Sequence, residues 1–149
     1  LDYPRLDVWG ISDHDLFAAA NSNLTSSETK EPFFAIIQTA TNHRPYSIPK
    51  NIDSFSIVEK AETELKQAGF SSIEQYNAMR LLDNAVGTFI KNAKEASYFE
   101  NSIFIFFGDH GTSDPPAIHM EKSDFDLKAC SVNKVICLNS NILKVLSDC

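Results

Sequence analysis

An adjacent aspartate and histidine, Asp109 and His110, stand between two glycines after the apolar run of residues 103–107. Such a run of β-branched and aromatic residues is typical of a buried strand, and ligands of α/β sheets gather beyond the carboxyl ends of strands. A carboxylate beside an imidazole suits a divalent ion such as zinc or manganese, and Gly108 and Gly111 let the two side chains converge. Two ligands do not complete a metal site, so a solvated Asp-His pair in a strand-to-loop turn remains the alternative.

A second pair of residues with a possible chemical role, His43 and Arg44, lies in the polar loop of residues 39–49. This loop follows the apolar run of residues 33–37. If the two apolar strands are parallel and near neighbours, both loops open at the same edge of the sheet. A histidine and an arginine near a divalent ion form a site for a tetrahedral oxyanion, because all three stabilise negative charge on its oxygens. The alternative for His43 is a loop histidine that is hydrogen-bonded to the backbone.

The elements that must position these loops include several helices. Three serines, each followed three residues later by an acidic residue, predict helix starts: Ser12 with Asp15, Ser56 with Glu59 and Ser71 with Glu74. Gly69 stands where a glycine would end the second helix. Within residues 73–96 apolar residues recur at spacings of three and four, namely Tyr76, Met79, Leu82, Val86 and Phe89. This spacing places them on one face of a long helix that packs against the sheet.

The order of these elements predicts an α/β fold with a mainly parallel sheet sandwiched by helices. Strands at residues 33–38 and 102–107 are separated by the helical middle of the chain, which implies a right-handed parallel crossover between them.

Composition limits the classes of function. The chain has 149 residues, of which 43% are hydrophobic, and a formal net charge of −7. These values are ordinary for a globular protein, and the negative charge argues against sequence-independent binding to nucleic acid or anionic membranes. We expect no transmembrane segment within these residues, because no apolar run approaches the roughly 18 residues that cross a bilayer.

The residues around both loops resemble a known family. Gly108-Asp109-His110-Gly111 after an apolar strand resembles the metal-binding motif of the alkaline phosphatase and sulfatase superfamily. The strand that begins at Pro32, followed by Asn42-His43-Arg44-Pro45-Tyr46, resembles the branch of lipoteichoic-acid synthases and phosphoglycerol transferases, as does Trp9-Gly10-Ile11-Ser12-Asp13. The resemblance covers roughly residues 3–127 and implies an alkaline-phosphatase-like (sulfatase) fold.

The resemblance also implies roles for individual residues. Asp109 and His110 would be ligands of the catalytic metal, which is manganese in the synthase branch and zinc or calcium in some relatives. His43 would contact the phosphate of the substrate, and Arg44 is a further candidate for binding it. His119, which follows the metal motif, either approaches the metal or the substrate or is a surface histidine.

The catalytic nucleophile is not expected in this chain. The family forms a covalent phospho-enzyme on a threonine, serine or formylglycine that lies on an earlier strand, and Thr39 and Thr41 follow the wrong strand to replace it. We therefore interpret residues 1–127 as the C-terminal part of a sulfatase-like catalytic domain, incomplete and inactive alone. Residues 128–149, which hold all three cysteines, depart from the family pattern and are interpreted as an atypical, truncated or frame-shifted tail.

Three functions remain open at this point. The first is a segment of a metal-dependent phosphoglycerol or phosphoethanolamine transferase, and its substrate would be a phospholipid head group or a cell-envelope glycan. The second is a sulfatase or phosphatase of the same fold, and the third is a degenerate, non-catalytic fragment. The motif His43-Arg44-Pro45-Tyr46 favours the first. The resemblance then implies a bacterial inner-membrane protein with an extracytoplasmic catalytic domain.

Overall fold

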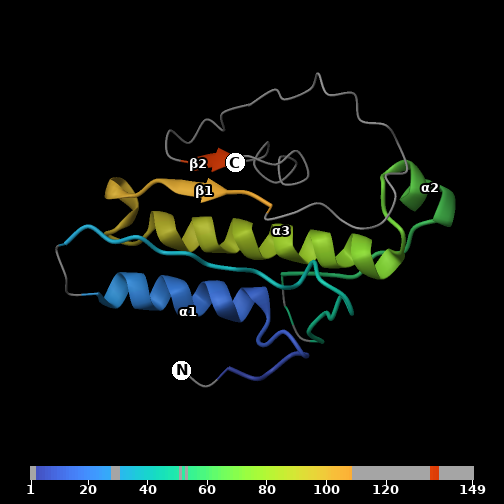
Figure 1. Cartoon of the computed structure of the whole chain (residues 1–149), viewed down its shortest axis with the longest axis horizontal. Coiled ribbons are helices and arrows are strands. Elements are labelled where there is room, and N and C mark those ends of the chain that lie inside the picture. Colours follow the sequence, from blue (N-terminus) through green and yellow to red (C-terminus); the bar gives the residue numbers. More distant parts are fainter. Residues whose placement is uncertain (1–2, 28–30, 51, 53, 109–134, 138–149) are drawn as a thin grey trace.

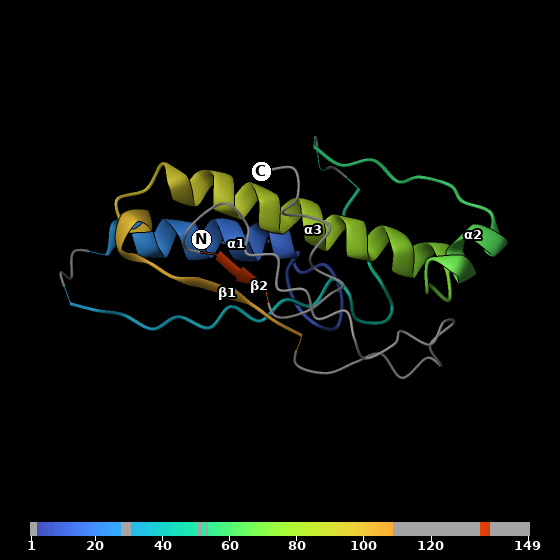
Figure 2. The ribbon, with the colours of Figure 1, turned by 90° about the horizontal axis from the view of Figure 1, so that it is seen from above.

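The computed structural model describes residues 3–27, 31–50, 52, 54–108 and 135–137. These residues form α1 (Asp13–Ser26), α2 (Glu62–Gln67), α3 (Ile73–Lys94), the short 3₁₀ helix η1 (Phe99–Asn101), β1 (Phe104–Phe106) and β2 (Val135–Cys137). Helices α1 and α3 lie side by side as one layer, and β1, β2 and the extended residues 32–39 lie along one side of α3 (Figures 1 and 2). None of the helices in this described part combines the length and apolar character that crossing a membrane requires.

Helix α1 begins where the sequence predicts. The Ser12 side chain accepts a hydrogen bond from the Asp15 backbone amide at 3.1 Å. The acidic residues Asp13 and Asp15 in the first turn interact favourably with the positive end of the helix dipole. Phe17 is buried and stacks on Phe89 of α3 with ring centroids 4.9 Å apart. This pair joins the two long helices.

Helix α3 is capped by Ser72, one residue after the predicted start, because the Ser72 side chain accepts from the Gln75 amide at 3.2 Å. Its most buried apolar residues are Ala78, Leu81, Ala85, Val86, Phe89, Ile90 and Ala93. Of the predicted apolar stripe, Val86 and Phe89 belong to this core, while Tyr76, Met79 and Leu82 are half-buried and line a cleft. The helix therefore has a wider apolar surface than the single stripe predicts.

The helix start predicted at Ser56 is wrong, because α2 begins only at Glu62. The preceding residues are held in an extended conformation by α3. The Asn77 side chain accepts from the Val58 amide at 3.1 Å and donates to the Val58 carbonyl at 3.0 Å. These bonds replace those that a helix would have formed. The predicted end of α2 is confirmed, since Gly69 has a φ of 81°, which favours glycine.

The predicted strand at residues 102–107 is confirmed as the shorter β1, which pairs in parallel with β2 in the register Phe104 with Val135 and Phe106 with Cys137. Its predicted burial is wrong, because Ile103 is 73% and Phe107 62% exposed. Residues 33–38 are extended and run in the same direction as β1, as the predicted crossover requires (Figure 1). Residues 33–38 do not pair with β1 in the described sheet, which contains β1 and β2. Their expected burial is also wrong, because Phe34 is 89% and Ile36 79% exposed. The described residues thus contain a two-stranded parallel pair, and the predicted mainly parallel sheet between helices is not confirmed.

Candidate functional site

The start of α1 holds the loop that contains His43. The Asp13 side chain is almost fully buried, and its two carboxylate oxygens accept from the backbone amides of Ala40 at 2.9 Å and Thr41 at 3.1 Å. Hydrogen bonds to a charged acceptor are stronger than those between neutral groups. The first turn of the helix and the beginning of the loop are therefore fixed to each other.

Trp9 supports the same loop from outside. Its ring lies against the His43 ring with centroids 3.9 Å apart and an interplanar angle of 46°. Its indole Nε1 donates to the Arg44 carbonyl at 2.7 Å. Trp9 is itself held by a tight turn, in which its backbone amide donates to the Asp7 side chain at 2.8 Å. The indole thus fixes both the ring of His43 and the backbone of the next residue.

His43 is exposed and its ring has a defined orientation. Its Nδ1 lies 3.1 Å from the Arg44 carbonyl oxygen. Because a carbonyl only accepts, Nδ1 must carry a proton, which leaves Nε2 to accept in the neutral ring and to donate in the protonated ring. The hydrogen bond to the backbone, which the sequence left open as an alternative, is therefore present. It occupies one nitrogen only, so the ring can still bind a ligand through the other.

The polar residues near His43 include atoms that have no hydrogen-bond partner in the described part of the chain. Thr41 is 6% exposed, and its Oγ1 is such an atom. Asn42 Oδ1 is a second such atom in this loop, and His14 Nε2, next to Asp13 in α1, is likewise buried without a partner among the described residues. Buried polar atoms are usually paired, and unpaired ones are common at functional sites. The residues that precede His43 therefore offer further polar groups to a ligand or to water.

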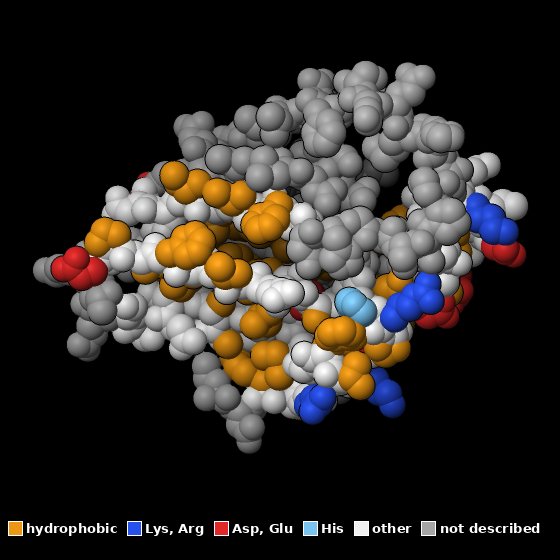
Figure 3. Space-filling view, in the orientation of Figure 1, with side chains coloured by type: hydrophobic (Ala, Val, Ile, Leu, Met, Phe, Trp, Pro, Cys, Tyr) orange, Lys and Arg blue, Asp and Glu red, His pale blue; other side chains and the backbone are white. Residues whose placement is uncertain are grey.

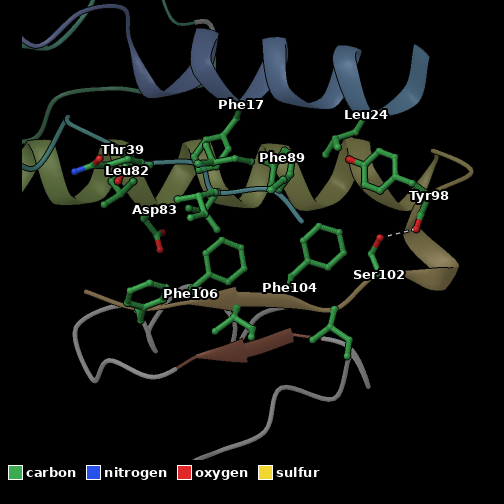
Figure 4. Close-up of a pocket in the computed structure, with 18 of the residues that line it drawn as sticks. Phe17, Leu24, Thr39, Leu82, Asp83, Phe89, Tyr98, Ser102, Phe104 and Phe106 are labelled. Atoms are coloured by element: carbon green, nitrogen blue, oxygen red, sulfur yellow. Dashed lines mark hydrogen bonds between the residues drawn. The ribbon is translucent and has the colours of Figure 1, made fainter. Parts of the chain in front are cut away.

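Asp83 on α3 is a second unusual acidic group. It faces the cleft between α3 and β1, and its Oδ1 is buried without a partner among the described residues (Figure 4). Burial raises the pKa of the Asp83 carboxyl, and the nearby charge of Arg80 lowers it by less. This carboxyl is half-buried and lies far from the His43 loop in the sequence, and the sequence predicted no role for it in the site.

The structure describes two of the predicted site residues, which are neighbours in the sequence. His43 and Arg44 lie on one ordered loop, whereas Asp109, His110 and His119 lie outside the described residues. Residues 33–38 and β1 run in the same direction, so these two described segments end on the same side of the layer (Figure 1). The described ranges contain no group of three or more potential metal ligands.

Asp13 is the residue that the sequence reasoning missed. An aspartate in the first turn of a helix is normally explained by the helix dipole, so its type and position gave no sign of a tertiary contact. The one signal for Asp13, as for Trp9, is the segment Trp9-Gly10-Ile11-Ser12-Asp13, on which part of the family resemblance rests.

Comparison with known proteins establishes the family. The model of the Sulfatase family matches residues 2–137, so the chain belongs to the sulfatase family. Lipoteichoic acid synthase 1 of Bacillus subtilis is 33% identical over 102 residues, which cover 68% of this chain and 14% of that protein. Lipoteichoic acid synthase of Staphylococcus aureus (strain USA300) is 30% identical over 115 residues, which cover 76% of this chain and 16% of that protein.

A crystal structure of a protein in the alkaline phosphatase superfamily from Vibrio parahaemolyticus is 30% identical, with a TM-score of 0.49, and covers 66% of this chain and 21% of that chain. The resemblance to the sulfatase superfamily and its lipoteichoic-acid synthase branch, predicted from the loop motifs, is confirmed by the family match and the relatives. The chain spans only about a sixth of the curated relatives that it matches.

Proposed function

We propose that this chain is part of a metal-dependent phosphoglycerol or phosphoethanolamine transferase that acts on lipids or glycans of the cell envelope. The observation that carries the proposal is the construction of the His43 loop. An exposed imidazole is held by Trp9 and by the loop that Asp13 fixes, with Nδ1 occupied and Nε2 left for a ligand. The relatives named as lipoteichoic acid synthases support transfer rather than the hydrolysis of a sulfatase or phosphatase.

In this proposal Asp109 and His110 hold a divalent metal, with manganese preferred and zinc or calcium as alternatives. Their donor set suits such an ion, because it combines a carboxylate oxygen with an imidazole nitrogen, and a complete site needs at least one further ligand. The metal, when bound, supplies positive charge that polarises the phosphoryl group. His119 is a further candidate for this end of the site.

His43 contacts the phosphate in this proposal. Since Nδ1 donates to the Arg44 carbonyl, Nε2 can donate to a phosphate oxygen only when the ring is protonated. The Arg44 guanidinium adds positive charge to the same loop, which favours an anionic oxygen there. The ring is therefore an oriented hydrogen-bonding group, and its contact with Trp9 keeps it from turning away.

The nucleophile is proposed to lie outside the 149 residues, so the roles of these residues are best tested in a protein that also contains the nucleophile. Replacing Asp109 or His110 by Ala should remove most transfer activity and lower the bound metal. His43→Ala should spare the metal and impair use of the phosphate donor, and His43→Gln is the matched variant that keeps a neutral amide donor.

Metal content and transfer rate, measured for all four variants, decide between the roles. Equal loss of metal in the Asp109 and His43 variants would make His43 a ligand rather than a substrate contact. Full activity in the Asp109→Ala variant would overturn the assignment of the whole site.

A further inference from the structure

The turn of residues 5–10, here called the Trp9 turn, carries apolar side chains on its outer surface. Val8 is 72% and Trp9 51% exposed, and Pro4, which precedes the turn, is exposed as well. Single exposed apolar residues are common on protein surfaces, so exposure alone does not indicate a partner. Two further features of the Trp9 turn, its main-chain hydrogen bonds and its charge, distinguish it from such residues.

Main-chain groups of the Trp9 turn are paired by residues of the turn itself. The Arg5 guanidinium donates from Nε to the Asp7 carbonyl at 2.7 Å and from Nη2 to the Val8 carbonyl at 2.9 Å. The amides of Trp9 and Gly10 donate to the side chain and the carbonyl of Asp7. Main-chain groups that are already paired lose little when water is removed, whereas unpaired ones cost several kcal/mol in an apolar medium. The turn can therefore leave water with its conformation intact.

Basic side chains accompany the apolar ones. Arg5 belongs to the Trp9 turn, and Arg44 lies beside it, because the Arg44 carbonyl accepts from the Trp9 indole at 2.7 Å. Figure 3 shows basic side chains and a histidine beside hydrophobic side chains on one face of the molecule. The chain as a whole has a formal net charge of −7. An anionic surface therefore repels the chain as a whole and attracts it only where the local charge is positive.

From these observations we propose that the Trp9 turn is a docking site for the surface of a lipid bilayer with anionic head groups. Val8 and Trp9 enter the head-group region, where tryptophan is favoured because its ring is apolar and one edge of it is polar. Arg5 and Arg44 stay at the level of the lipid phosphates, with their alkyl stems along the apolar surface.

Docking at the Trp9 turn would bring the His43 loop to the lipid head groups, because the rings of Trp9 and His43 lie 3.9 Å apart. The inference thus adds to the proposed function a direction from which a lipid substrate arrives. It can fail separately from that function, since binding to a bilayer requires neither a metal nor a nucleophile.

The test uses the 149-residue chain and vesicles of phosphatidylglycerol and phosphatidylcholine. Cosedimentation measures the partition coefficient, and nitroxide-labelled lipids in bicelles of the same composition broaden the NMR signals of amides that approach the lipid. Val8→Asn is the diagnostic variant, because Arg5 bonds to the Val8 carbonyl and the substitution leaves that carbonyl in place. Ile57→Asn is the matched control, since Ile57 is 61% exposed in another segment. Ile36→Asn tests a competing apolar surface, where Ile36 is 79% exposed.

We expect the chain to bind these vesicles and the nitroxide to broaden the amide signals of residues 6–10 more than those of residues 54–61. Val8→Asn should lower the partition coefficient about fivefold, because a valine with this exposure contributes about that factor when it leaves water. Ile57→Asn and Ile36→Asn should leave the partition coefficient unchanged. Vesicles of phosphatidylcholine alone should bind at least threefold more weakly, and added salt should weaken binding to the anionic vesicles.

Three outcomes would overturn the proposal. Absence of binding by a chain that retains its helical circular dichroism would remove the docking site. A loss of binding in Ile36→Asn or Ile57→Asn that equals or exceeds the loss in Val8→Asn would assign the contact to another apolar surface. Equal binding to vesicles with and without phosphatidylglycerol would remove the charge complementarity. None of these outcomes changes the metal content or transfer rate of the His43 and Asp109 variants, by which the proposed function is tested.

Discussion

Asp13 should contribute more to stability than its place in the first turn of a helix suggests. Replacement by Ala removes the acceptor of the Ala40 and Thr41 amides. A hydrogen bond to a charged group contributes about 1.5–3 kcal/mol. Thr41 is a buried residue, so its amide is left without a hydrogen-bond partner after the change. Ala40 is only half-buried, so its amide can form a hydrogen bond to water instead. We therefore expect Asp13→Ala to lower the free energy of unfolding by about 3 kcal/mol.

The matched control is Asp15→Ala. Asp15 lies in the same first turn, and its carboxylate accepts only from the Ser12 hydroxyl, at 2.8 Å, among the described residues. Its removal costs the interaction with the helix dipole and part of the cap, about 1 kcal/mol. Asp13→Asn keeps one acceptor oxygen, so its effect should fall between those of the two alanine variants.

Urea unfolding followed by circular dichroism measures these differences, and a constant slope against urea would confirm that the variants unfold from comparable states. Loss of peak dispersion for the amides of residues 40–44 and 46 in NMR spectra of Asp13→Ala would show that the loop is released. If the free energies of unfolding of Asp13→Ala and Asp15→Ala agreed within about 0.5 kcal/mol, the two hydrogen bonds from Asp13 to the loop would add nothing to stability, and the prediction would be wrong.

Three further predictions concern other parts of the molecule. Val86→Asp buries an unpaired charge in the core, so it should cost several kcal/mol in thermal unfolding, whereas Lys91→Asp on the exposed side of α3 should cost far less. The purified chain should not turn over nitrophenyl phosphate, nitrophenyl sulfate or labelled phosphatidylglycerol with manganese or zinc, and turnover abolished by Asp109→Ala would contradict this. Burial raises the pKa of Asp83, so ionisation of this carboxyl opposes folding above that pKa. We therefore expect Asp83→Asn to raise the free energy of unfolding at neutral pH and to have no such effect in acid, where the carboxyl is protonated. Urea unfolding at both pH values measures the difference.

Local signals in the sequence predicted the elements whose causes are local. Ser12 caps α1 through a neighbouring amide, Gly69 ends α2 with a positive φ, and the spacing of apolar residues identified α3. The family resemblance likewise rests on short motifs and was confirmed. The serine of the second predicted helix start, Ser56, had the same local signal as Ser12, but contacts from Asn77 to the neighbouring Val58 prevailed over it.

The errors at residues 33–38 have a tertiary cause. An apolar run shows that a segment is suited to a buried strand. Pairing in a sheet also requires a neighbouring strand in register, and the residues of the run do not specify that neighbour. Here a cleft lies where that neighbour was expected. The same limit applies to Asp13, whose two partners are 27 and 28 residues away in the sequence. Residues 109–134 fall outside the described part, so the metal pair stays a prediction.

The contact between Trp9 and His43 gives the protein a built-in optical reporter. The sequence contains one tryptophan, so the intrinsic emission excited at long ultraviolet wavelengths arises from Trp9 alone, which lies against His43. Because the His43 ring lies against the indole, a bound anion that moves this ring changes the surroundings of the indole and hence its emission. Phosphate-containing head groups can therefore be screened against the unlabelled protein by its own brightness, with His43→Gln as the blank.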